Sequence, residues 1–239
     1  MILRWLISFS AFCLLASLQA QSLATVSGSV SLADSKEPAV RAGKDFSGVL
    51  VWLEGGPSIR TIAAAHASMV QKGKRFTPHL LPIVAGTTVD FPNYDPIFHN
   101  AFSNFDGKVF DVGLYPPRTS RAVRFDRPGV VRVFCNIHPT MSAIIAVLPT
   151  PYFAVSRADG SFSITGVPRG EYTLRVLHER ATPATLDALD RKIVVRDAPI
   201  STPPIAISES GYLPLPHKNK YGKDYPAVIE DTFYPGAKK

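Results

Sequence analysis

The chain has 239 residues, a length that suits one large domain or two small ones, and a formal net charge of +7 from 26 lysines and arginines against 19 aspartates and glutamates. The two signs of charge are interspersed, whereas a dedicated nucleic-acid-binding protein concentrates its basic residues in a stripe, so we expect no nucleic-acid partner. The moderate basic excess favours contact with acidic partners or anionic surfaces.

Residues 1–20 have the pattern of a secretory signal peptide. Arg4 gives a positive start, and a nearly uncharged apolar run and a small-residue cleavage site follow it. The run is short for a membrane span and no second hydrophobic stretch follows, so we expect a periplasmic or secreted protein with no membrane span in the mature chain. An uncleaved N-terminal anchor is the alternative. Cleavage would also remove Cys13 and leave Cys135 as the only cysteine.

The rest of the chain has the pattern of an all-β protein. Short apolar runs alternate with turn signals such as Asp106-Gly107 and Asp159-Gly160, and this spacing predicts sandwiches or barrels. The strands expected, in chain order, are Val26–Leu32, Val49–Leu53, Thr88–Phe91, Arg121–Phe125, Val130–Phe134, Ala143–Leu148, Phe162–Ile164, Tyr172–Leu177 and Ile193–Val195. Only Thr61–Ser68 and Thr185–Asp190 look mildly helical.

The first and last groups of strands carry two halves of one pattern, a Gly-x-Val strand near Val26 and an Asp-Gly-x-Phe turn followed by Pro-x-Gly-x-Tyr-x-Leu after Ala158. This pattern resembles the carboxypeptidase-regulatory-like (transthyretin-like) β-sandwich, in which the halves are usually consecutive. The resemblance implies that residues 21–56 and 151–208 form one sandwich, with a second domain, 57–150, inserted at a loop tip, where insertions are tolerated. Two domains in tandem are the alternative.

The intervening segment contains a set of soft metal-binding side chains. Cys135, His138 and Met141 lie in one short loop, and His99 lies upstream in an aromatic-rich loop. A lone cysteine in an exported protein cannot form an internal disulfide, so another role is expected. A thiolate, two imidazoles and a thioether are the ligands of a blue-copper site, in which the methionine is the weak axial ligand. A zinc site is the main alternative, although zinc gains little from a thioether.

The same segment resembles the cupredoxins, and its Cys-x-x-His-Pro-x-Met loop is similar to that of the amicyanins. The resemblance implies that His99, Cys135 and His138 are the strong ligands and that Met141 is the axial one. It also implies that the backbone amide of Asn100 bonds the cysteine sulfur while its side chain helps to hold the ligand loop. Amicyanins lack the surrounding sandwich, so the resemblance does not identify the partner.

We therefore expect one type 1 copper ion and a periplasmic one-electron carrier that docks on a redox protein such as a c-type cytochrome or a periplasmic dehydrogenase. No Ser-His-Asp set, phosphate-binding loop or pair of catalytic acids is evident in the sequence, so an enzyme is not expected. The alternatives are a copper-handling protein for storage or delivery, and a non-redox binding module with a structural metal.

The remaining histidines and the tail lie outside the predicted metal site. His79 is expected to have a structural or surface role, and His66 and His217 are expected to be solvated. The tail, 209–239, is rich in proline, lysine and tyrosine and has no strand or helix periodicity. It could stay extended, but its many aromatic side chains favour a tail that wraps over the sandwich.

Overall fold

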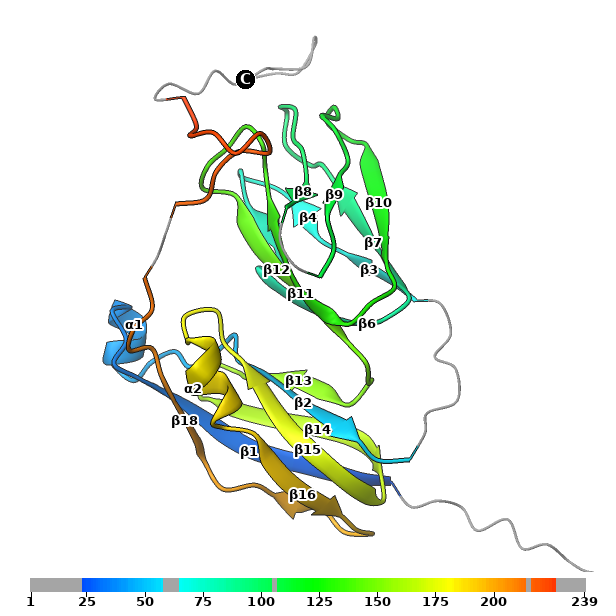
Figure 1. Cartoon of the computed structure of the whole chain (residues 1–239), viewed down its shortest axis with the longest axis vertical. Helices are drawn as coiled ribbons and strands as arrows, with labels where there is room; N and C mark the ends of the chain where they lie inside the picture. The colour runs from blue at the N-terminus through cyan, green and yellow to red at the C-terminus, as the bar shows by residue number, and fades with distance from the viewer. Residues whose placement is uncertain (1–22, 58–64, 105–106, 214–215, 227–239) are drawn as a thin grey trace, which may run out of the picture.

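The computed structural model describes residues 23–57, 65–104, 107–213 and 216–226 (Figure 1). The predicted signal peptide, 1–20, and Cys13 lie outside these residues. The described chain is nearly all β, as predicted, with two short helices, α1 (Pro38–Arg41) and α2 (Pro183–Asp187). Neither helix is long and apolar enough to cross a membrane.

Two groups of strands form separate bodies in Figure 1. The split unit is built from both ends of the chain and holds two sheets, in the orders β14-β1-β17, with β18 also on β1, and β13-β2-β15-β16. Its strands are β1 (Leu23–Ala33), β2 (Leu50–Gly55), β13 (Phe153–Val155), β14 (Ser161–Pro168), β15 (Gly170–Leu177), β16 (Arg191–Val195), β17 (Ile200–Ser201) and β18 (Ile205–Ser208).

Strands far apart in the sequence pair within the split unit. β1 lies antiparallel to β14, with Ser27 opposite Ser163, and β2 lies antiparallel to β15, with Leu53 opposite Leu174. Alternate residues such as Val26 and Leu53 point into one shared apolar core, because side chains alternate between the faces of a strand. The pairing predicted between Val26–Glu54 and Asp159–Val195 is therefore confirmed.

One glycine of the split unit is required by close packing. A Cβ added at Gly28 would lie 2.2 Å from Oγ1 of Thr202 and 2.7 Å from the ring of Phe162, so no larger residue fits between them. At position 28 of β1, therefore, only glycine fits without moving the neighbouring side chains.

The middle unit lies between the two halves of the split unit in sequence and contains the sheets β10-β7-β3 and β6-β12-β11-β8-β9 and the ribbon β4-β5. Its strands are β3 (His66–Ser68), β4 (Val70–Gln71), β5 (Phe76–Thr77), β6 (Leu80–Val84), β7 (Thr87–Pro92), β8 (Phe102–Ser103), β9 (Phe110–Asp111), β10 (Ser120–Phe125), β11 (Gly129–Phe134) and β12 (Ser142–Leu148). A second apolar core, which includes Phe91, Val133 and Ile145, fills the space between its strands.

The two helical expectations have different outcomes. For Thr61–Ser68, residues 61–64 lie outside the described chain, while β3 pairs in parallel with β7, so the helix prediction is wrong for His66–Ser68. Ala67 packs against the core between two exposed neighbours, and this period of two is that of a strand. Within Thr185–Asp190 the helix prediction is confirmed by α2 as far as Asp187. The side chain of Thr182 caps the first turn of this helix by accepting from the N–H of Thr185 at 3.2 Å.

The two units contact each other directly. Leu50 of the split unit and Leu148 of the middle unit belong to one small apolar cluster. Beside this cluster, Nε2 of His79 in the middle unit lies 2.6 Å from Oε2 of Glu179 in the split unit. The ring of His79 also donates through Nδ1 to the carbonyl of Ser142 at 3.1 Å. His79 thus has the structural role expected of it.

Candidate metal centre

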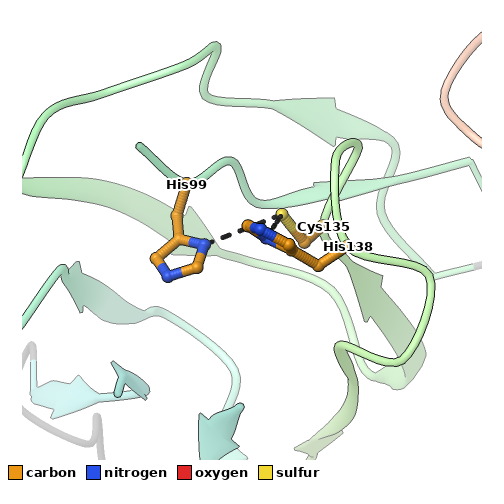
Figure 2. A group of neighbouring side chains, drawn as sticks. All are labelled: His99, Cys135 and His138. Carbon is orange, nitrogen blue, oxygen red and sulfur yellow. Dashed lines mark hydrogen bonds between the residues drawn. The ribbon is translucent and has the colours of Figure 1, made fainter. Parts of the chain in front are cut away.

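Three donor atoms from two loops converge at one point in the middle unit (Figure 2). Cys135 directly follows β11, and His138 lies in the tight loop before β12. His99 lies in the connection between β7 and β8, where its backbone forms an isolated antiparallel β-bridge with Tyr115. One donor atom from each residue, the sulfur of the cysteine and one ring nitrogen of each histidine, lies within 4.8 Å of the other two.

The spacing of these atoms fits a single metal ion. Sγ of Cys135 lies 3.6 Å from Nδ1 of His138 and 4.0 Å from Nδ1 of His99. When a metal ion binds a sulfur and a nitrogen at about 2.0–2.3 Å, with a trigonal angle of about 120° between the two bonds, the two donor atoms lie about 3.6 Å apart. All three side chains are buried, and His138 is only 3% exposed. These residues can therefore hold a metal ion away from bulk water.

His99 is oriented by a buried carboxylate that we did not predict to have a role. Its Nε2 lies 2.7 Å from Oδ2 of Asp95. The same carboxylate accepts from the backbone N–H of Gly73 through Oδ1 at 2.6 Å and from that of Lys74 through Oδ2 at 2.9 Å. Burial opposes ionisation of Asp95, but these donors outweigh it and lower the pKa of the carboxyl. Asp95 is therefore an acceptor, so Nε2 carries the proton and the lone pair of Nδ1 faces Cys135.

The protonation of His99 also suits a ligand. Burial lowers the pKa of its imidazole, and the hydrogen bond to Asp95 only partly opposes this effect. The ring is therefore neutral near pH 7. Metal-binding histidines commonly donate their second ring N–H to a carboxylate, which fixes both the tautomer and the ring orientation.

The sulfur of Cys135 is surrounded by backbone donors. Burial raises the pKa of its thiol, while hydrogen bonds from the N–H groups of Ile137, His138 and Asn100 oppose the rise. The metal-free thiol is thus protonated near pH 7, and a metal must displace this proton when it binds. The same N–H groups stabilise the negative charge of the thiolate after the proton has left.

Asn100 connects the segments on either side of the site. Its side-chain amide donates to Oδ1 of Asp111 at 2.7 Å and to the carbonyl of Gly113 at 2.9 Å, while its Oδ1 accepts from the N–H of Asn136 at 3.3 Å. These hydrogen bonds link the segment that follows His99 to the residue that follows Cys135, and the expected role of Asn100 in a metal centre stays a prediction.

Met141 completes the short loop. It is fully buried in the core cluster that includes Cys135, and its backbone N–H donates to the carbonyl of His138 at 3.1 Å. The N–H of Cys135 donates in turn to the carbonyl of Met141 at 3.2 Å, which closes the loop at its base. Its role as the axial ligand stays a prediction.

Two residues of the tail are also close to this loop. The ring of His217 stacks on Phe134 with centroids 4.1 Å apart, so the expectation that His217 is solvated is wrong. The hydroxyl of Tyr225 donates to the carbonyl of Cys135 at 2.7 Å. No local pattern in the sequence indicates contacts across so long a separation; only the unusual number of aromatic residues in the tail pointed to packing.

Comparisons with known proteins give partial likenesses. No family model matches the chain, and no curated protein matches it in sequence. A purple cupredoxin from Nitrosopumilus maritimus is similar to 34% of this chain over 99% of its own, with 26% identity and a TM-score of 0.31. An amicyanin variant in its reduced form is similar to 41% of this chain over 98% of its own, with 14% identity and a TM-score of 0.34.

A copper-containing nitrite reductase from Thermus scotoductus is similar to 50% of this chain over 28% of its own, with 23% identity and a TM-score of 0.33. All three TM-scores are low. The assignment of a metal site therefore rests on the donor atoms of this chain and on their spacing.

Proposed function

We propose that this protein is an exported type 1 copper protein and serves as a periplasmic one-electron carrier. The observation that carries the proposal is the convergence of one cysteine sulfur and two histidine Nδ1 atoms in a buried site, at distances that suit trigonal binding of one ion. Met141 would supply the weak axial thioether. The mixture of thiolate and imidazole donors favours copper, because it accommodates both Cu(I) and Cu(II).

The chain's own residues would provide a rigid, dry site. Asp95 fixes the tautomer and the orientation of His99, and Asn100 ties the segment that follows His99 to the loop that follows Cys135. Bound copper would supply the exchange of a single electron. Because the ligands are buried and held by hydrogen bonds, they would move little when the charge of the ion changes.

We infer a domain organisation that follows the two cores. Residues 57–150 would form a cupredoxin domain, inserted into a carboxypeptidase-regulatory-like sandwich made of 21–56 and 151–208, and 209–239 would form the tail. Residues 1–20 would be the cleaved signal. The partner would be a redox protein, such as a c-type cytochrome or a periplasmic dehydrogenase, with an acidic face that the basic excess of this chain attracts. No catalytic role is proposed.

Reconstitution separates this function from its alternatives. The purified protein is loaded with Cu(II), and its copper content, visible spectrum and reversibility of oxidation are measured. A carrier would bind one copper, absorb intensely in the visible range, show a reversible couple and retain the ion against a chelator. A copper-handling protein would release the ion to the chelator. A colourless protein that prefers zinc would refute the copper assignment.

A further inference from the structure

Residues 216–226 of the tail lie against the loop that carries Cys135, and we call them the C-terminal strap. In Figure 1 the chain leaves β18 of the split unit and reaches the opposite end of the middle unit, where the strap appears in red. There the N–H of Lys220 donates to Oδ1 of Asn136 at 2.9 Å, and Nδ2 of Asn104 donates to the carbonyl of Lys220 at 3.2 Å. The strap is therefore attached to the middle unit by its backbone.

A polar chain leads from the strap to the carbonyl group of Cys135. Nδ1 of His217 lies 3.2 Å from the carbonyl of Lys218, which can only accept, so Nδ1 carries a hydrogen. The same Nδ1 lies 3.2 Å from the hydroxyl oxygen of Tyr225, so its single hydrogen is shared between that oxygen and the carbonyl of Lys218. The hydroxyl then donates its own hydrogen to the carbonyl of Cys135 at 2.7 Å. Hydrogen bonds in such a series strengthen one another.

A second connection reaches the loop from the other side. Nζ of Lys220 lies 2.7 Å from Oδ2 of Asp111, and Oδ1 of the same carboxylate accepts from Nδ2 of Asn100. Asn100 in turn accepts from the N–H of Asn136. The strap thus contacts both the carbonyl of the cysteine and the network that holds the residue after it.

We propose that the C-terminal strap is part of the metal centre and that Tyr225 is a positioning residue for Cys135. By holding the carbonyl of Cys135, the hydroxyl fixes the backbone from which the sulfur projects, and the strap restricts access to that sulfur. The inference deepens the proposed function and rests on it for the role of copper. The effect on the cysteine itself does not depend on any metal.

The test uses the metal-free, full-length protein carrying Cys13→Ala, so that Cys135 is the only thiol. The rate of alkylation by iodoacetamide is compared between this parent, Tyr225→Phe and Tyr221→Phe. Tyr221 lies in the same strap but is 69% exposed, so it is a matched control. Loss of the partly buried hydrogen bond should make alkylation of Tyr225→Phe about fivefold faster, while Tyr221→Phe reacts like the parent. Equal rates in all three proteins, or equal acceleration in both variants, would overturn the proposal.

A second measurement concerns the loaded protein. After addition of Cu(II), Tyr225→Phe should keep the copper content of the parent but shift its visible band, because the thiolate would no longer be held in the same orientation. An unmoved band would overturn the positioning role. If the parent bound no copper, the proposed function would fail, while the alkylation rates would still decide whether the strap covers and holds Cys135.

Discussion

Asp95 and His99 form a buried pair, with Oδ2 of the carboxylate 2.7 Å from Nε2 of the imidazole. This contact directs the other ring nitrogen toward Sγ of Cys135, 4.0 Å away. The N–H groups of Gly73 and Lys74 hold the carboxylate in turn, so the β4-β5 ribbon contributes to the orientation of a ligand that lies more than twenty residues later. The geometry of the candidate metal site thus depends on residues well beyond its three donors.

Replacing Asp95 should weaken metal binding without abolishing it. Asp95→Asn removes the charge that orients His99, and loss of such a partner typically costs about 10- to 100-fold in metal affinity. The measurement is a competition titration of copper against a chelator of known affinity. Asp90→Asn is the control, because Asp90 is a carboxylate on β7 that pairs with the exposed His66. Equal affinities of Asp95→Asn and the parent would remove Asp95 from the site.

Met141→Leu should leave copper binding and colour in place and raise the reduction potential. In the proposed site the thioether is the weak axial donor, and its removal should destabilise Cu(II) more than Cu(I). Cyclic voltammetry of the loaded protein measures the change. Met69→Leu is the control, since Met69 is fully buried in the same core cluster. A potential that moved equally in both variants, or in neither, would deny Met141 its place as a ligand.

The contact between the two units should depend on pH through His79. Both ring nitrogens face acceptors, Glu179 and the carbonyl of Ser142, so the charged imidazolium is favoured. The hydrogen bond to Glu179 raises the pKa of His79 above its ordinary value of 6.5, and the same bond lowers the pKa of Glu179 below 4.5. The stabilisation from His79 is therefore fully present below about pH 6.5 and is lost as the pH rises through the raised value.

Urea unfolding of the parent and of His79→Gln tests this dependence. The parent should exceed the variant in unfolding free energy at about pH 5.5, and the difference should shrink at about pH 8.5. The side chain of His79 is 52% exposed, so the effect should be small. His66→Gln is the control, because His66 forms an exposed pair with Asp90 inside one unit. A difference that grew with pH would contradict the assignment.

Gly28→Ala should destabilise the split unit. The new Cβ would lie 2.2 Å from Oγ1 of Thr202 and against the ring of Phe162, and overpacking of this kind typically costs about 1–3 kcal/mol. Chemical denaturation measures the loss, with Ser163→Ala, on the exposed side of β14, as the control. An unfolding free energy of Gly28→Ala equal to that of the parent would contradict this prediction, because it would mean that the neighbours of Gly28 make room for a methyl group without loss of stability.

Much of the fold could be predicted from the sequence because several of its longer strands alternate in burial, although β12 is buried on both faces. β1 and β15 show a period of two, and the split sequence pattern indicated that the strands of Val26–Glu54 pair with those of Asp159–Val195. Strands of two residues, such as β4 and β8, carry no period and were missed. The helix prediction for Thr61–Ser68 was wrong at His66–Ser68, because a three-residue strand has too few positions to distinguish the period of a helix from that of a strand.

Some residues of the candidate site could likewise be predicted from the sequence, and others could not. The spacing of Cys135 and His138 within one loop is a local signal, and the structure brings His99 to them as predicted. Asp95 carries no local signal, since a carboxylate four residues before a histidine is common. Tyr225 and His217 contact the loop only because the chain returns to it from the split unit, and nothing in the sequence between them and Cys135 indicates that return.

The most direct test of the copper assignment compares the visible spectra of the parent and Cys135→Ser after both are loaded with Cu(II) and their copper contents are measured. The parent should bind one copper with an intense visible band that arises from its thiolate, and Cys135→Ser should lose that band even if some copper remains. A band that survived in Cys135→Ser, or a parent that stayed colourless with bound copper, would contradict the assignment of a blue-copper site.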